Sequence, residues 1–172
     1  MAPASLSAVA TSSLSTTWPL RGLFTLSEVY CFGVSSLNEI PWSELRERAI
    51  HATSLSYSPY SHVKVGAAGY TTDGRIVEGA NVENASFGLT LCAECSLVSD
   101  LIRQGGGRLA AVSIVAGDTQ PIAPCGRCRQ LLFEHGGGGL LVDAGLDESP
   151  RHLHELLPDA FGPDDLGLRA NP

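Results

Sequence analysis

Two Cys-x-x-Cys pairs constrain the fold of this chain more than any other feature of its sequence. The first lies in Leu91-Cys92-Ala93-Glu94-Cys95 and the second in Pro124-Cys125-Gly126-Arg127-Cys128. Cysteines three residues apart in a helix share one face, so each pair can hold a metal ion from a single turn. A carboxylate two residues after the first cysteine can transfer protons beside that ion. The pattern predicts a zinc site with Glu94 as its acid and base.

The first pair leaves two kinds of zinc site open. If Cys92 and Cys95 both bind, the site is a closed Cys₄ structural centre with no position for a substrate. If only Cys92 binds, the fourth position is open for water and Glu94 lies next to it, which suits a hydrolase. The spacer from Cys95 to Cys125 exceeds the about 15 to 20 residues of compact zinc ribbons, which favours the open site. A dithiol redox centre needs only one such pair and is the weakest alternative.

Composition limits the partners and the compartment. The formal net charge of −7 argues against DNA or RNA, because lysine and arginine supply most affinity for phosphates. No apolar run approaches the about 18 residues of a membrane span, so we expect a soluble protein with no membrane partner. Four of the five cysteines fall in the two pairs, which suits metal binding in a reducing cytoplasm better than a disulfide framework.

Hydrophobic patterning divides the chain into an extension and one domain. Residues 1–40 are rich in Ala, Ser and Thr, hold no lasting period and predict a poorly ordered extension, or a mis-assigned translation start. Residues 41–166 predict the domain and 167–172 a tail. Helices are expected over 41–57, 92–103, 125–134 and 153–157, and strands over 63–70, 75–80, 109–116 and 140–142. This order predicts a three-layer α/β/α sandwich with a mixed central sheet.

With these residues in view, the chain resembles the cytidine deaminase family, in its small homotetrameric type with three cysteine ligands. The resemblance runs from about Trp42 to Leu166 and rests on six motifs in the right order. They are Tyr57-Ser58-Pro59-Tyr60-Ser61, Val65-Gly66-Ala67-Ala68, Asn81-Val82-Glu83-Asn84-Ala85, Cys92-Ala93-Glu94, Pro124-Cys125-Gly126-Arg127-Cys128-Arg129-Gln130 and Leu156-Leu157-Pro158-Asp159-Ala160-Phe161-Gly162. The Cys-Ala-Glu-Cys variant is typical of actinobacterial members.

The resemblance implies Cys92, Cys125 and Cys128 as ligands of one Zn²⁺ per subunit, with water in the fourth position. Glu94 is then the proton shuttle, which takes a proton from water, delivers it to N3 of cytosine and later protonates the departing ammonia. The implied reaction is hydrolytic deamination of cytidine and 2′-deoxycytidine to uridine and 2′-deoxyuridine in pyrimidine salvage. The partner is thus a small nucleoside, and the assembly a homotetramer.

The same resemblance assigns the substrate-binding residues. Asn81 and Glu83 match residues that hold the ribose hydroxyls, although such a run alone is more typical of a polar turn. Ala93 belongs to the substrate-binding set as well. Phe87 matches a tyrosine that reaches a neighbouring subunit's nucleoside in many relatives, and it lacks the hydroxyl. Phe161 matches an aromatic residue that closes the site from another subunit. Packing of the C-terminal segment is an equally good explanation of a phenylalanine at this position.

Two positions depart from the family pattern. Val63 stands where most relatives carry a phenylalanine that stacks on the pyrimidine, a contact worth about 1 to 3 kcal/mol per base in single-strand binders. Blasticidin S deaminase also lacks this phenylalanine, so deamination of a cytosine-nucleoside antibiotic is one alternative, although the intact 81–85 motif favours cytidine. Cys95 replaces an arginine that bonds the zinc thiolates, and Arg129 is a candidate for the missing charge. A non-catalytic Cys₄ interaction domain is the other alternative.

Overall fold

The structure, a computed structural model, describes residues 40–117, 119–145 and 147–170 and places side chains as far as residue 166. The extension expected over 1–40 lies outside the described residues, except for Ile40, which is buried in the core. No helix in the described ranges combines the length and apolar character of a membrane span.

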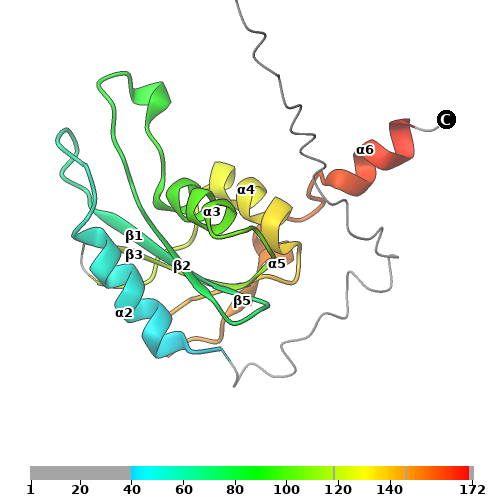
Figure 1. Ribbon diagram of the computed structural model, residues 1–172, viewed down its shortest axis with the longest axis horizontal. Helices are drawn as coiled ribbons and strands as arrows, with labels where there is room; N and C mark the ends of the chain where they lie inside the picture. Colours follow the sequence, from blue (N-terminus) through cyan, green and yellow to red (C-terminus); the bar gives the residue numbers. More distant parts are fainter. Residues whose placement is uncertain (1–39, 118, 146, 171–172) are drawn as a thin grey trace, which may run out of the picture.

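A five-stranded mixed sheet forms the middle layer of the molecule (Figure 1). Its strands are β1 (Val65–Thr71), β2 (Ile76–Ala80), β3 (Leu109–Ala116), β4 (Leu141–Val142) and β5 (Arg151–His152). They lie in the order β2-β1-β3-β4-β5, with β3 and β4 parallel and all other neighbours antiparallel. The antiparallel β1–β2 pair is a hairpin, because Gly74 at its turn adopts φ 85° without a steric cost.

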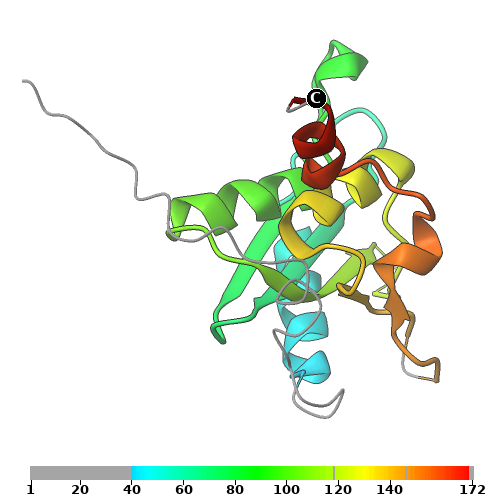
Figure 2. The ribbon, with the colours of Figure 1, turned by 90° about the vertical axis from the view of Figure 1, so that its right-hand side faces the viewer.

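Helices cover both faces of this sheet (Figures 1 and 2). They are α2 (Trp42–Thr53), the 3₁₀ turn η2 (Phe87–Leu89), α3 (Ala93–Arg103), α4 (Gly126–Gly136), α5 (Leu153–Leu156) and α6 (Pro163–Ala170). Successive strand residues face opposite layers: Ala67 packs with the α3, α4 and α5 residues, whereas Ala68 packs with α2. The two separate buried clusters confirm the predicted three-layer α/β/α sandwich with a mixed sheet.

The first helix ends earlier than its apolar spacing predicts. Helix α2 stops at Thr53 instead of residue 57. The backbone of Tyr57 pairs with the 81–83 segment: its N–H donates to the Asn81 carbonyl at 3.1 Å, and its carbonyl accepts from the Glu83 N–H at 2.8 Å. Tyr57 cannot make these bonds and also continue the helix. The pairing with the distant segment therefore overrides the helical preference of residues 54–57.

Two C-terminal elements were not predicted. Strand β5 has only two residues, too few to show any alternation in sequence. Helix α6 lies in a segment for which no helix was predicted, although Pro163 at its first position and Asp164 and Asp165 in its first turn are favourable start signals. The Asp165 carboxylate accepts a hydrogen bond from the Gly162 N–H at 2.7 Å, which fixes the entry to the helix.

A glycine lets α3 lie directly on the sheet. A Cβ atom at Gly79 of β2 would stand 2.2 Å from the Leu97 nitrogen and 2.3 Å from the Ala93 carbonyl oxygen. Ser96 also donates to the Ala80 carbonyl at 2.8 Å. The first turns of α3 are therefore fixed against β2, which sets the position of Cys92 and Glu94.

Candidate active site

The N-termini of α3 and α4 bring three thiols together. Cys92 and Cys125 occupy the N-cap positions of the two helices, with extended backbone, and Cys128 lies in the first turn of α4. The three Sγ atoms lie within 4.8 Å of one another, and those of Cys92 and Cys125 are 4.0 Å apart. Tetrahedral zinc with Zn–S bonds of about 2.3 Å needs sulfurs about 3.8 Å apart, so the donor set fits Zn²⁺.

Cys95 does not join this cluster. Within the described ranges, the cluster of Cys92, Cys125 and Cys128 is the one group of three or more possible ligand side chains close enough to hold a metal. Cys95 instead lines a groove of about 500 Å³ between α3 and α4, beside Val98, Arg127 and Leu131. Three thiols leave one position of a tetrahedral ion for water, which supports the open alternative over the closed Cys₄ centre.

Glu94 lies beneath the thiols in the first turn of α3. Its side chain is buried, with the residue only 3% exposed, and burial raises the pKa of the carboxyl group. A hydrogen bond with the Cys128 thiol acts in the opposite direction. A buried carboxylate with a raised pKa can take a proton and hold it, which is what a proton shuttle requires.

The surroundings oppose ionisation of two of the three thiols. Burial raises the pKa of Cys92, and burial followed by the charge of Glu94 raises the pKa of Cys128. Burial acts in the same direction on Cys125, but hydrogen bonds from the Cys128 N–H and from the neighbouring thiols outweigh it and lower the pKa. Metal binding to this set therefore releases protons, as is usual for cysteine sites.

Arg129 donates hydrogen bonds to two backbone carbonyls. Its Nε donates to the Pro124 carbonyl at 2.9 Å and its NH1 donates to the Leu156 carbonyl at 2.8 Å. Neither of these bonds goes to a thiol, so Arg129 stays only a candidate for the charge of the arginine replaced by Cys95. The guanidinium instead ties the residue before ligand Cys125 to the end of α5.

Asn81 is buried next to the site and holds the loop that follows α2. Its Oδ1 accepts hydrogen bonds from the Val65 N–H at 2.9 Å and from the Ser56 hydroxyl at 2.5 Å. Its Nδ2 donates to the Val63 carbonyl at 2.9 Å. Three of the four hydrogen-bonding positions of the amide are therefore used within the protein, and one N–H remains.

Glu83 binds the same loop from a half-buried position. Its Oε2 accepts from the Tyr60 N–H at 2.9 Å and the Ser61 N–H at 3.2 Å, and its Oε1 accepts from the Ser61 hydroxyl. The hydroxyl bond is the largest cause of a lowered pKa for Glu83, which keeps the carboxylate ionised. Ser56 and Ser61 were not among the predicted site residues. One sequence feature points to both serines: Ser61 is the last residue of the 57–61 motif, and Ser56 directly precedes that motif.

The remaining predicted contacts lie at the surface, apart from Ala93, which is fully buried. Val63, Phe87 and Phe161 are exposed by 52%, 75% and 53%. The Phe87 ring meets the Tyr60 ring edge to face, with 6.1 Å between centroids. The Phe161 carbonyl accepts a hydrogen bond from Gln130 of α4 at 2.7 Å, so its backbone is held on the helix that carries Cys128.

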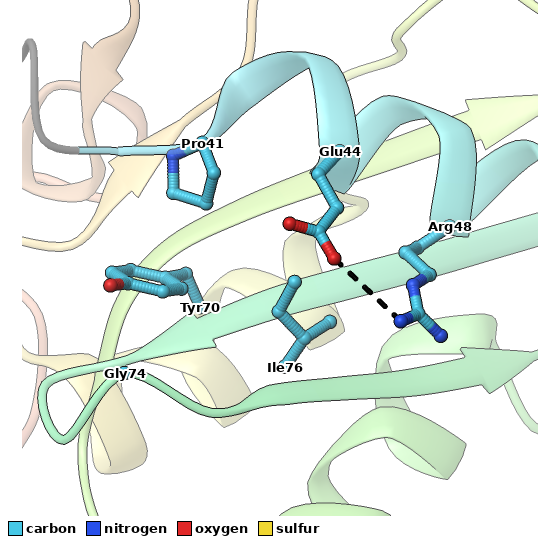
Figure 3. Close-up of a pocket in the computed structure, with 6 residues that line it drawn as sticks. All are labelled: Pro41, Glu44, Arg48, Tyr70, Gly74 and Ile76. Atoms are coloured by element: carbon cyan, nitrogen blue, oxygen red, sulfur yellow. Dashed lines mark ion pairs between the residues drawn. The ribbon is translucent and has the colours of Figure 1, made fainter.

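A second hollow of about 480 Å³ lies on the other face of the sheet (Figure 3). Its lining residues are Pro41, Glu44, Arg48, Tyr70, Gly74 and Ile76. They come from α2 and the β1–β2 hairpin, and they include an exposed ion pair between Glu44 and Arg48 at 3.6 Å. This hollow contains none of the clustered thiols, which lie in the layer of α3 and α4.

Comparison with known proteins agrees with this geometry. Residues 42–142 match the family described as cytidine and deoxycytidylate deaminase zinc-binding region. A cytidine deaminase of Mycobacterium tuberculosis is 54% identical over 128 residues, which cover 74% of this chain and 95% of that protein. A cytidine deaminase of Halalkalibacterium halodurans is 39% identical over 125 residues, which cover 71% of this chain and 95% of that protein.

Solved structures give the same result. The crystal structure of cytidine deaminase from Mycobacterium tuberculosis matches with a TM-score of 0.69 at 53% identity, covering 72% of this chain and 99% of that one. The structure of cytidine deaminase from Mycobacterium leprae matches with a TM-score of 0.67 at 49% identity, covering 70% of this chain and all of that one, 100%. On the evidence of its sequence, its fold and its three clustered thiols, this chain belongs to the cytidine deaminase family.

Proposed function

We propose that this protein catalyses the zinc-dependent hydrolytic deamination of cytidine and 2′-deoxycytidine to uridine and 2′-deoxyuridine. The observation that carries the proposal is the buried Glu94 carboxyl group beside three thiols whose spacing fits Zn²⁺. Cys92, Cys125 and Cys128 would hold the ion. When bound, Zn²⁺ supplies a Lewis acid that lowers the pKa of water.

Glu94 provides the proton transfers of this reaction. Its carboxylate takes a proton from the attacking water and delivers it to N3 of the pyrimidine, which makes C4 more electrophilic. After water adds at C4, Glu94 takes the proton of the new C4 hydroxyl group and passes it to the amino group, which leaves as ammonia as the C4 carbonyl forms. The raised pKa of Glu94 suits both directions of transfer, because the group holds a proton without releasing it to solvent.

Asn81 and Glu83 are suited to bind one sugar hydroxyl. They lie two residues apart in an extended segment, so both side chains are on the same side. Glu83 has one of its about four acceptor positions left, and Asn81 has one donor left. A single sugar hydroxyl can donate a hydrogen bond to the Glu83 carboxylate and accept one from the Asn81 amide. Binding through one hydroxyl is compatible with both ribose and deoxyribose substrates.

The other contacts of the nucleoside follow from their positions. The buried Ala93 side chain cannot reach a substrate, but its backbone N–H is at the start of α3, where helix N–H groups have no helical partner. Val63 borders the loop held by Asn81 and offers an aliphatic surface to the base. This smaller contact is expected to weaken cytidine binding compared with a stacked ring.

We further propose a homotetramer in the cytoplasm that serves pyrimidine salvage. Phe87, Leu89 and Phe161 expose large apolar side chains. A second copy that covered these side chains would remove them from water and bring an aromatic residue toward a neighbouring site. The four described cysteines are free thiols, and a reducing compartment keeps such thiols available for zinc. We place the catalytic unit within residues 41–166.

A parallel assay tests the proposed function. The loss of ultraviolet absorbance is followed with cytidine, 2′-deoxycytidine and blasticidin S as substrates, and zinc is measured in the same samples. We expect turnover of the two nucleosides, and a loss of about 10² to 10⁴ in kcat for Glu94→Gln with zinc retained. Turnover of blasticidin S alone would identify an antibiotic deaminase. No turnover of any substrate at one zinc per chain would identify a non-catalytic zinc domain.

A further inference from the structure

The Ser61 hydroxyl lies between two residues assigned to the nucleoside. It donates to Oε1 of Glu83 and accepts from the Val63 N–H at 3.0 Å. Glu83 is the proposed sugar contact and Val63 the proposed base contact. The sequence places these two residues far apart along the chain, and this hydroxyl connects them directly.

The contact at Oε1 controls the orientation of the Glu83 carboxylate. The two backbone donors, from Tyr60 and Ser61, both bind Oε2. Bonds to Oε2 alone restrict the carboxylate less than bonds to both oxygens would, because the torsion about the last side-chain bond has a broad preference. Among the described residues, the Ser61 hydroxyl is the donor that holds Oε1, so together with the bonds to Oε2 it fixes the plane of the carboxylate and the direction of its remaining lone pair.

The turn that carries Ser61 needs the same contacts to keep its shape. His62 adopts φ 61°, a left-handed conformation that is unfavourable for a residue with a side chain. The turn is closed by hydrogen bonds from the His62 N–H to the Ser58 carbonyl at 3.1 Å and from the Val63 N–H to the Ser61 hydroxyl. Loss of the hydroxyl removes one of these closures and also releases Oε1 of Glu83, while Oε2 keeps its two backbone donors.

We propose that Ser61 is a positioning residue for nucleoside binding, which acts by fixing the Glu83 carboxylate and the Val63 backbone. The proposal rests on the proposed function, in which Glu83 accepts a sugar hydroxyl. Ser61 touches neither the thiols nor Glu94 among its hydrogen-bond partners. Its contribution is therefore to binding in the ground state and the transition state alike, which changes KM and leaves kcat in place.

Steady-state kinetics with cytidine test this role. We expect Ser61→Ala to raise KM by about tenfold, the effect of losing one hydrogen bond to a charged group, with kcat changed by less than about twofold. Zinc content is expected to stay at that of the unchanged protein. Ser61→Thr keeps the hydroxyl and should restore most of the KM. Ser54→Ala is the matched control, because the Ser54 hydroxyl donates to the His51 carbonyl at the end of its own helix, at 2.7 Å, and to neither Glu83 nor Val63.

A double-mutant cycle with Glu83→Gln separates the two levels of the proposal. If Ser61 acts through Glu83, the effects of Ser61→Ala and Glu83→Gln on KM should combine to less than their product. An unchanged KM in Glu83→Gln would refute the sugar contact itself and with it the proposed function of Glu83. A raised KM in Glu83→Gln with an unchanged KM in Ser61→Ala would overturn the positioning role alone. A fall in the kcat of Ser61→Ala that matches a loss of bound zinc would also overturn the positioning role.

Discussion

Cys95 and Cys128 occupy equivalent positions in their helices, yet only one of them belongs to the thiol cluster. Each lies three residues after an N-cap cysteine, and their local spacing is identical. Cys128 belongs to the cluster and is fully buried, whereas Cys95 is half-buried and lines the groove between α3 and α4. The difference arises from how the two helices pack, because α4 turns its first-turn thiol toward α3 and α3 turns Glu94 toward α4.

Replacement of Cys95 should leave the metal in place. We expect Cys95→Ser to retain about one zinc per chain and most of its deaminase activity, since a three-thiol site needs only Cys92, Cys125 and Cys128. Zinc measured after dialysis against a weak chelator checks this, with Cys125→Ser as the variant expected to lose the ion. Equal zinc loss in both variants would mean that the centre is a closed Cys₄ site.

At the level of elements, the site depends on how closely α3 approaches β2. Gly79 allows the helix backbone to touch the strand, and Ser96 and Asp100 add hydrogen bonds from α3 to the β2 backbone. Helix α4 is fixed in turn through Arg129, Gln130 and the C-terminal segment that runs from α5 to α6. The two N-termini are thus held by separate contacts, and the thiols meet where these contacts place them.

A side chain at Gly79 should therefore disturb both stability and metal binding. In Gly79→Ala the new methyl group would overlap the α3 backbone, and overpacking of this kind costs about 1 to 3 kcal/mol. A shift of α3 would also move Cys92 and Glu94, so zinc should be released faster to a chelator. Thermal unfolding and a zinc-release assay measure the two effects.

Gly139→Ala is the control for this experiment, because a Cβ atom there meets nothing within 4 Å. An unchanged unfolding temperature and zinc-release rate in Gly79→Ala would contradict the close approach of α3 to β2.

At the scale of the whole molecule, a buried ion pair connects the α2 layer to the sheet. Arg46 donates to both Asp143 carboxylate oxygens, at 2.8 and 2.7 Å, and Ser113 donates to Asp143 at 2.8 Å. Burial alone would raise the pKa of Asp143, but the hydrogen bonds from Arg46 and Ser113 outweigh burial and hold the pKa below its usual range. The pair joins residues from the two ends of the domain, on the face opposite the thiols.

This ion pair should make stability depend on pH in the acid range. Because the pKa of Asp143 is lower in the folded than in the unfolded state, its contribution is fully present above the unfolded value of about 3.9 and is lost as pH falls through the folded value. We expect Asp143→Asn to lower the free energy of unfolding at pH 7 by about 3 kcal/mol, since it leaves Arg46 without its charge partner.

Urea unfolding at pH 7 and at about pH 3 checks the sign. The difference between the unchanged protein and Asp143→Asn should shrink at the lower pH. Glu47→Gln, at an exposed position on the same helix, is the control. A difference that grows as pH falls would contradict the lowered pKa of Asp143.

The sequence by itself determined the layers, the strands of the hairpin and β3, because short-range periodicity is a local property of the chain. Its Cys-x-x-Cys spacing determined four candidate zinc donors but left open whether Cys95 is one of them. Only the tertiary structure decided the end of α2 at Thr53, the formation of β5 and the separation of Cys95 from the other thiols. It also revealed Ser61, whose hydroxyl joins Glu83 to Val63. These features depend on contacts between distant segments, and no local pattern encodes which helix face turns toward the metal.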